Sequence, residues 1–318
     1  MTSPAHSLVA DVGGTNTRVA LAVGRQVIDE TIRRYENKDH GSLQDILSGY
    51  LNEHGSITCA KAAVAIAGPV RDGAGGLTNL NWHIDEAELK DITTGEFNCV
   101  LNDLQAQGHA ADLLHEEHLR MVLAGSVSSR PDATKLVIGV GTGFNASAVF
   151  TAHGKRNVVP SEVGHTLLPA KTPEDLSLNE FLAKHYGYPS VEEALSGRGL
   201  RQIYNWYVND HNGEASSGEI IERCIQQSDD NARLAVAKFV ELMGVVFGDI
   251  ALVHLPFGGI YLIGGMARAA SAFFDQFGFA ENFKDKGPLS ELMSEFSVYV
   301  VEDDFAALKG LAAHLDEI

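Results

Sequence analysis

The sequence predicts an α/β protein of two related domains, each a mixed sheet flanked by helices, that face each other across a cleft. Two observations support this fold class. A strand, a glycine-rich turn and a second strand at residues 8–23 recur at residues 136–150, about 130 residues later, as in an internal duplication. The chain of 318 residues also has about twice the length of a typical domain. Paired domains of this kind commonly bind ligands in the space between them.

The first domain opens with this strand, turn and strand. Leu8–Val12 is a short apolar run of strand type, Gly13–Asn16 is a turn, and residues 18–23 are again strand-like. A Walker loop or a dinucleotide fingerprint needs a helix directly after the glycines, so both are disfavoured. The elements expected next are a helix over 42–53 capped by Ser42, a buried strand over 62–67 ending at Gly68-Pro69, a strand over 99–101 ending at Asn102-Asp103, and a helix over 105–114.

The second domain repeats the unit with a strand over 136–140, a turn over 141–145 and a strand over 146–150. Leu195–Gly199 is expected to form a further turn in a region that is otherwise mostly helical. The remaining elements are expected as amphipathic helices over 176–186, 216–228 and 230–254, a core strand over 261–263, a helix over 266–277, and a final helix over 304–315 that packs on the first domain. The predicted domains are residues 1–107 with 303–318, and residues 108–302.

The charge of the chain disfavours two classes of partner. Lys and Arg total 24 against 42 Asp and Glu, which gives a formal net charge of −18 and a pI near 5.0. Such a surface repels phosphate backbones and anionic lipid, so neither nucleic acid nor a membrane is an expected partner. A bound polyphosphate would have to be held locally, by backbone amides and a divalent cation.

Cysteine usage and the apolar stretches indicate a cytoplasmic protein. Cys59, Cys99 and Cys224 form no CxxC pair, so neither a disulfide framework nor a cysteine zinc site is expected. The first basic residue is Arg18, so the charged start of a signal peptide is missing. The uncharged stretch 250–267 is interrupted by a proline and by glycine pairs, which favours a turn and a buried strand over a membrane span.

Both glycine turns are candidate phosphate sites. A tight turn between antiparallel strands can direct several backbone N–H groups at one anion, and glycine allows close approach and positive φ. Asp11, just before the first turn, could hold Mg²⁺ directly or through water. The alternative is two ordinary hairpins, but the recurrence of Thr beside Gly favours phosphate binding. The candidate residues are Gly13, Gly14, Thr15 and Asn16 in the first turn, and Gly141, Thr142 and Gly143 in the second.

The pair Asn102-Asp103 follows a buried strand, at the end where α/β sheets place ligand groups. An aspartate there could accept the proton of a substrate hydroxyl as the hydroxyl attacks phosphorus. The alternative is an Asx turn or an N-cap for the following helix, which local sequence favours.

Glu162, His165 and Glu192 form a third candidate group. Carboxylates and imidazole can make the paired hydrogen bonds that a polyhydroxylated sugar requires. The alternatives are a metal site and ordinary surface charge. Gly264-Gly265 joins a strand to a helix, where an adenine or a ribose could lie against the backbone, or where the chain only turns.

Taken in order, these segments resemble the bacterial glucokinase family of the actin-like hexokinase superfamily, over nearly the whole chain. Asp11–Arg18 resembles the first phosphate motif, Asn102-Asp103 the sugar-binding Asn and the catalytic Asp, and Glu162–His165 the Glu-x-Gly-His loop. Further matches are Thr78-Asn79-Leu80-Asn81-Trp82 with the Thr-Asn-x-x-Trp segment, Glu192 and Leu195–Gly197 with Glu-x-x-Leu-Ser-Gly, Phe257–Gly265 with the adenosine region, and Leu308–Ala313 with the closing helix.

The resemblance implies two actin-like (ribonuclease H-like) domains and ATP-dependent phosphorylation of glucose at the 6-hydroxyl. Asp103 would be the general base, and Asn102, Glu162, His165 and Glu192 would hold the ring hydroxyls. The two glycine turns would hold the phosphates of ATP, with Mg²⁺ near Asp11 through water. Such relatives are often homodimers, so a cytoplasmic homodimer is expected.

Two points stay open at this stage. The second phosphate turn of the family is commonly Gly-Thr-Gly-Leu-Gly, whereas this chain has Phe144-Asn145 at its end. Because asparagine tolerates a left-handed backbone, the turn is expected to survive. The acceptor is also open, since a kinase of another sugar would share these turns; a nicotinamide enzyme and a non-catalytic sugar sensor are the remaining alternatives. The cysteine-rich zinc motif of repressor-type sugar kinases is absent from the sequence.

Overall fold

The computed structural model describes residues 5–77, 80–127, 130–210 and 213–318. The chain divides into two compact units. Unit 1 consists of residues 1–114, 152–160 and 303–318, and unit 2 consists of residues 115–151 and 161–302. Within the described residues, no helix is long and apolar enough to cross a membrane.

Unit 1 is built on a sheet with the strand order β3-β2-β1-β5-β9, with β4 paired to β2. β1 and β2 form the predicted antiparallel hairpin, whereas β1, β5 and β9 run parallel. The parallel strands are short runs of small and branched apolar residues, typical of strands that are covered on both faces. The strands of this sheet are β1 (His6–Val12), β2 (Asn16–Val23), β3 (Gln26–Val27), β4 (Arg33–Glu36), β5 (Cys59–Ile66) and β9 (Phe97–Asn102).

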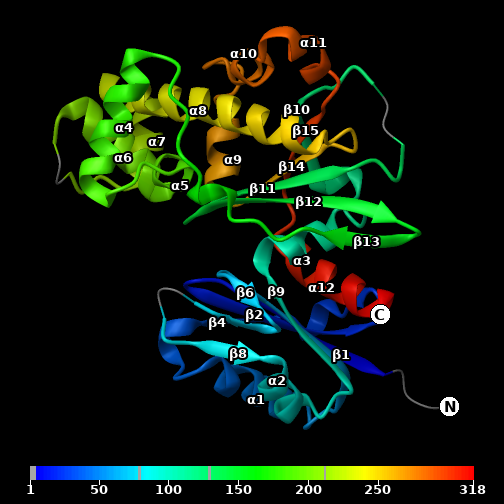
Figure 1. Ribbon diagram of the computed structural model, residues 1–318. Coiled ribbons are helices and arrows are strands. Elements are labelled where there is room, and N and C mark those ends of the chain that lie inside the picture. The colour runs from blue at the N-terminus through cyan, green and yellow to red at the C-terminus, as the bar shows by residue number, and fades with distance from the viewer. Residues whose placement is uncertain (1–4, 78–79, 128–129, 211–212) are drawn as a thin grey trace. The chain divides into compact units, whose positions relative to one another are not determined.

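Helices cover both faces of this sheet (Figure 1). Alternate residues of β1 point to opposite faces, so Leu8 packs with α1 (Leu43–Glu53) and Val9 with α12 (Ala306–Glu317). Gly310 lets α12 lie against α3 (Asp103–Ala110), because a Cβ there would overlap the carbonyl oxygen of Ala106. The other elements of unit 1 are α2 (Glu86–Thr93), the small sheet of β6 (Val70–Arg71), β7 (Ala74–Gly76) and β8 (His83–Asp85), and β13 (Lys155–Val158).

The second sheet has the strand order β10-β15-β14-β11-β12-β13. β11 and β12 repeat the antiparallel hairpin of unit 1, and β11, β14 and β15 run parallel. The long helix α8 packs on this sheet, with α6, α7 and α10 against it (Figure 1). The strands are β10 (Leu119–Leu123), β11 (Lys135–Val140), β12 (Phe144–Ala152), β14 (Ile260–Ile263) and β15 (Val298–Val301). The helices are α4 (Pro173–Tyr186), α5 (Val191–Ala194), α6 (Gly197–Val208), α7 (Ser217–Gln226), α8 (Asp230–His254), α9 (Gly265–Ser271), α10 (Phe279–Lys284) and α11 (Ser290–Met293).

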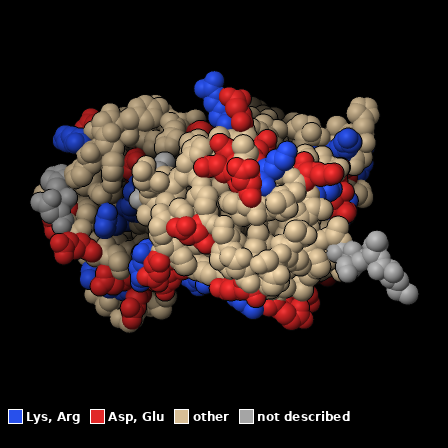
Figure 2. Space-filling view, turned by 90° about the horizontal axis from the view of Figure 1, so that it is seen from below, with Lys and Arg blue, Asp and Glu red and all other residues tan. Residues whose placement is uncertain are grey.

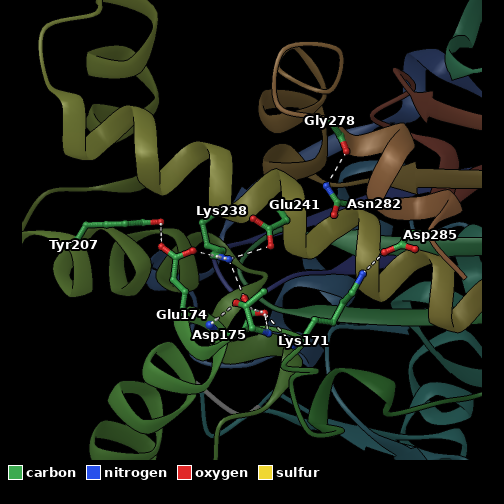
Figure 3. A network of polar contacts seen from close by, with 10 residues as sticks. Lys171, Glu174, Asp175, Tyr207, Lys238, Glu241, Gly278, Asn282 and Asp285 are labelled. Carbon is green, nitrogen blue, oxygen red and sulfur yellow. Dashed lines mark hydrogen bonds and ion pairs between the residues drawn. The ribbon is translucent and has the colours of Figure 1, made fainter. Parts of the chain in front are cut away.

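A buried lysine links α8 to α4 in unit 2 (Figure 3). The Lys238 ammonium, whose side chain is 2% exposed, lies 2.8 Å from Asp175, 3.0 Å from Glu241 and 3.3 Å from Glu174. Although burial raises the pKa of Asp175, hydrogen bonds from Lys238 and Thr172 bring it below the usual value. A buried ammonium is tolerated only with such partners, so this cluster fixes how the two helices meet.

The predicted strands and the Ser42-capped helix are confirmed, but several boundaries differ. α3 begins at Asp103 rather than at residue 105, because Asn102 supplies its cap. The predicted turn over Leu195–Gly199 is wrong beyond Ser196, which caps α6. The helix expected over 266–277 ends at Ser271. Acidic side chains, interspersed with basic ones, spread over the face shown in Figure 2, as the net charge leads one to expect.

Candidate active site

The candidate residues of unit 1 lie at one edge of its sheet. The register of the parallel strands places Val12 beside Ile66 and Ile66 beside Asn102, so all three strands end at the same level. The chain beyond β5 is tied to both neighbours, since Ala67 N–H donates to Val12 O at 2.9 Å and Asn102 Nδ2 to Gly68 O at 3.0 Å. The first glycine turn and Asp103 therefore leave the same edge of the sheet, on either side of β5.

The first glycine turn is a tight hairpin, closed by a hydrogen bond from Gly13 N–H to Asn16 O at 3.0 Å. Neither Gly13 nor Gly14 has a positive φ, so of the two properties of glycine named from the sequence, close approach and positive φ, the second is not used in this turn. What glycine provides at position 13 is space, because a Cβ there would lie 3.3 Å from the Asn16 carbonyl oxygen. Thr15, at the tip of the turn, is exposed.

Sequence reasoning missed Asn37, which holds this turn from outside the motif. Its buried side chain donates to Gly13 O at 2.8 Å and accepts from Thr17 Oγ1 at 2.9 Å. Its backbone N–H donates to Thr15 O at 2.9 Å. No local pattern marks residue 37, because its partners lie about 20 positions earlier in the chain.

Asp11 is the candidate metal ligand of unit 1. Its side chain is 15% exposed and pairs with Arg18 at 3.1 Å. Burial raises the pKa of Asp11, and the neighbouring guanidinium offsets only part of that effect. Mg²⁺ commonly takes one or two carboxylates together with water and phosphate oxygens, so a single buried carboxylate beside a phosphate turn fits such an ion.

Asn102 and Asp103 lie at the start of α3, where both interpretations of the pair, a candidate site and a helix N-cap, can be compared with the structure. Asn102 is the N-cap of α3: its Oδ1 accepts from Leu104 N–H at 3.0 Å, and Gln105 completes a capping box. Asp103 is the first residue of the helix, and its Oδ1 also accepts from Leu104 N–H, at 2.9 Å. The cap is therefore made mainly by the asparagine, and the aspartate stands in the first turn of the helix.

In unit 2 the second glycine turn is closed by Gly141 N–H donating to Gly143 O at 2.9 Å. Gly264, with a φ of 98°, lies directly against this turn, since a Cβ there would overlap the Val140 carbonyl oxygen. The N-terminus of α6 is joined to it as well, by Gly197 N–H and Gly141 O at 2.8 Å. Gly265, the first residue of α9, faces open space.

Glu192 contacts the second glycine turn through its carboxylate. Oε2 accepts from Phe144 N–H at 2.9 Å, and Oε1 pairs with Arg198 at 2.5 Å. Gly143 makes room for the carboxylate, because a Cβ there would lie 2.6 Å from Glu192 Oε2. Neither Gly141 nor Gly143 has a positive φ, so close packing is what requires glycine at position 143.

Glu162 and His165 lie on an exposed loop next to this turn, around a single 3₁₀ turn at Val163–His165. Gly164 brings the loop against β12, since a Cβ there would overlap the Phe144 carbonyl oxygen. The loop is also tied to the start of α5, where Val191 N–H donates to Thr166 O at 2.9 Å. Unit 2 thus brings together Glu162, His165, Glu192 and the second glycine turn.

Some predictions on this site need correction or lie outside the structure. The predicted turn over 141–145 is too long: Asn145 lies within β12, opposite Gly139, and its backbone is not left-handed. Thr78 and Asn79 of the Thr-Asn-x-x-Trp segment lie outside the described residues, whereas Trp82 is buried.

Among the described residues, one group of three has the spacing of metal ligands: His83, Asp85 and Glu88, whose ligand atoms all lie within 4.8 Å of one another. Asp85 and Glu88 already form the capping box of α2, with hydrogen bonds of 2.8 and 3.1 Å. Helix capping is a sufficient explanation for these two carboxylates.

An aspartate that shares a sheet edge with a glycine hairpin is compatible with the transfer of a phosphoryl group to a hydroxyl, the reaction of kinases that act on small hydroxylated molecules. The family model described as Glucokinase matches residues 8–318. The chain belongs to the Glucokinase family, which confirms the predicted family, fold class and enzyme class.

Individual relatives agree with this assignment. The chain is 33% identical over 310 residues to a glucokinase of Chelativorans sp. (strain BNC1), covering 96% of this chain and 90% of that protein. A solved glucokinase from an Antarctic psychrotroph superposes with a TM-score of 0.86 at 30% identity, over 98% of this chain and 99% of that one. A glucokinase of Balamuthia mandrillaris in complex with glucose has a TM-score of 0.81 at 21% identity, over 97% and 92% of the two chains, and supports the fold alone.

Proposed function

We propose that this protein transfers the γ-phosphoryl group of ATP to the 6-hydroxyl of glucose, with Asp103 as the general base. The observation that carries the proposal is the shared sheet edge of unit 1, where the Gly13–Asn16 turn follows β1 and Asp103 follows β9, two parallel strands that flank β5 and end at the same level. A base and a phosphate-holding turn must lie close together for a hydroxyl to attack phosphorus.

Asp103 has a specific role in this proposal. It orients the 6-hydroxyl and accepts its proton as the new oxygen–phosphorus bond forms. Asn102 directly precedes the base, and its amide is fixed by the helix cap and by the bond to Gly68 O. The remaining hydrogen-bonding capacity of this amide is available to the sugar. Positioning supplies most of the rate in phosphoryl transfer, so rigid caps of this kind matter.

The residues of unit 2 hold the sugar and the nucleotide in this proposal. Glu162, His165 and Glu192 accept and donate hydrogen bonds to ring hydroxyls. Each oxygen of Glu192 already has one protein partner, which fixes the carboxylate plane while leaving acceptor capacity for the sugar. The backbone amides of Gly141–Gly143 hold phosphate oxygens. Gly264 and Gly265 allow the adenosine to lie against the chain, because position 265 has no side chain and open space around it.

Mg²⁺ is the expected metal, and Asp11 is the side chain that would hold it, through water. When bound, the ion neutralises charge on the transferred phosphoryl group. The ion pair with Arg18 keeps the Asp11 carboxylate oriented.

We also infer a cytoplasmic protein that acts as a homodimer. All three cysteines are buried free thiols, as in a protein of a reducing compartment. Light scattering of the purified chain at micromolar concentration would give the dimer mass, and a monomer mass would contradict the inference.

The test of the general base is the variant Asp103→Asn, with Asp91→Asn on the exposed side of α2 as its control. The amide keeps an oxygen for Leu104 N–H, so the helix should form as before. We expect turnover to fall by about 10²- to 10⁴-fold, with glucose affinity within a few-fold. Turnover close to that of wild type would remove Asp103 from this role.

The acceptor is tested separately by ADP release with glucose, mannose, fructose and other hexoses. The proposal expects glucose to have the highest kcat/KM. A higher value for another hexose would replace glucose as the substrate while leaving the class of enzyme intact, because the phosphate turns do not contact the sugar ring.

A further inference from the structure

Asn145 stands where the resembling motif commonly has glycine, and its surroundings show a use for the side chain. Its amide faces the loop of Glu162 and His165. Nδ2 donates to Ser161 O at 2.5 Å and to Glu162 Oε2 at 3.4 Å. Oδ1 accepts from Val163 N–H at 3.1 Å and from Ala146 N–H at 2.9 Å.

These four contacts use the whole hydrogen-bonding capacity of the side chain. An asparagine amide has two N–H donors and an oxygen with two lone pairs. The reverse orientation would place the NH₂ group against two backbone N–H groups, so the partners allow only one orientation. The amide therefore binds three consecutive residues, 161 to 163, as a rigid clamp.

The clamp acts on the part of the loop that determines where the sugar-binding groups lie. Ser161 O and Val163 N–H flank Glu162, so both sides of that residue are tied to β12. The contact with Oε2 also limits the rotation of the Glu162 carboxylate. His165 follows on the same 3₁₀ turn, with its N–H donating to Glu162 O at 3.1 Å.

We propose that Asn145 is a positioning residue for sugar recognition, which holds Glu162 and His165 in the conformation that meets the sugar hydroxyls. This inference rests on the proposed function of those two residues. In this role Asn145 does not touch the substrate. It orders the loop before the sugar binds, so that less conformational entropy is lost on binding.

The test compares Asn145→Ala and Asn145→Asp with a matched control, Asn282→Ala. Asn282 is also half-buried in unit 2 and donates to one backbone carbonyl, Gly278 O at 2.9 Å, away from the loop (Figure 3). For Asn145→Ala we expect KM for glucose to rise about 5- to 30-fold, since the three hydrogen bonds to residues 161–163 are lost, with KM for ATP within about twofold. The control should change neither constant.

Asn145→Asp separates positioning from mere space filling. The carboxylate keeps the acceptor for Val163 N–H but turns a second oxygen towards Ser161 O and the Glu162 carboxylate. Like-charge repulsion should then raise KM for glucose at least as much as alanine does. A KM for glucose equal to that of wild type in both variants would overturn the proposal. An equal rise of KM for glucose and KM for ATP would overturn it too.

A second measurement keeps this test independent of catalysis. Val163 N–H is shared between Asn145 Oδ1 and Ser161 Oγ, each at 3.1 Å. In Asn145→Ala we expect its amide hydrogen exchange to accelerate about five- to tenfold, while the exchange of Val191 N–H stays unchanged. If the wild-type chain phosphorylates no hexose, the proposed function fails. Unchanged exchange of Val163 N–H in Asn145→Ala would show, independently of activity, that Asn145 does not hold the loop.

Discussion

The hydrogen bonds of Asn37 give a quantitative prediction about the first phosphate turn. The side chain of Asn37 is buried, and Thr17 is fully buried beside it. Asn37→Ala would leave the Thr17 hydroxyl and the Gly13 carbonyl without their present partner. Each buried polar group that loses its partner costs about 1–3 kcal/mol, so for two such groups we expect a loss of about 2–6 kcal/mol in the free energy of unfolding.

A double-mutant cycle separates the hydrogen bond from general packing. Thr17→Val removes the hydroxyl at nearly constant shape and should cost about 1–2 kcal/mol, because Asn37 Oδ1 loses its donor. The double variant removes both partners, so it should be less unstable than the sum of the single variants by at least about 1 kcal/mol. Additive effects would refute the reasoning.

The assay is urea unfolding at 25 °C, followed by tryptophan fluorescence in a Trp206→Phe background. The chain has two tryptophans, and the substitution leaves Trp82, in unit 1, as the reporter. The fluorescence then follows the unfolding of unit 1, and a transition of the same midpoint by circular dichroism in the peptide region is the check that a two-state treatment applies. In the same variants KM for ATP should rise about 3- to 10-fold with KM for glucose little changed, because the turn holds phosphate.

Two further predictions concern pH and the sugar. Burial lowers the pKa of His109 to about 3, with His314 and Arg156 adding to the effect, so the folded state stays neutral where the unfolded imidazole takes up a proton. His109 should therefore lower the free energy of unfolding by about 2 kcal/mol from pH 8 to pH 5. In His109→Phe this part of the pH dependence should be lost, whereas a variant of the exposed His115 should keep it. Glu192→Gln should weaken glucose binding measured by calorimetry, because an amide cannot accept through both terminal atoms; unchanged affinity would count against its role.

Local sequence predicted the parts of the site that depend on neighbours along the chain. The apolar runs around Asp11 and before Gly141 identified both hairpins, and Ser42 identified the start of α1. These features follow from hydrogen bonds and side-chain alternation within a few residues. The same reasoning identified Asn102-Asp103 as both a helix start and a candidate site, and the structure assigns the cap mainly to the asparagine.

Local reasoning failed where a residue acts on a distant segment. For glycine at position 143 the sequence suggests close approach to a phosphate and positive φ, but its φ is not positive, and the structure gives a further reason, the Glu192 carboxylate that packs against it. Asn145 was interpreted as a turn residue, whereas it lies in a strand and holds residues 161–163 by its side chain.

The sequence by itself determined the order of elements, the two glycine hairpins and the identity of the chemically competent side chains, because each depends on short-range pattern or on residue type. Only the tertiary structure decided which of them meet. The alignment of Val12, Ile66 and Asn102 comes from strand register, and the contacts of Asn37 come from a segment about 20 residues away. Register and side-chain contacts between segments are set by how the whole core packs, and no local pattern encodes that.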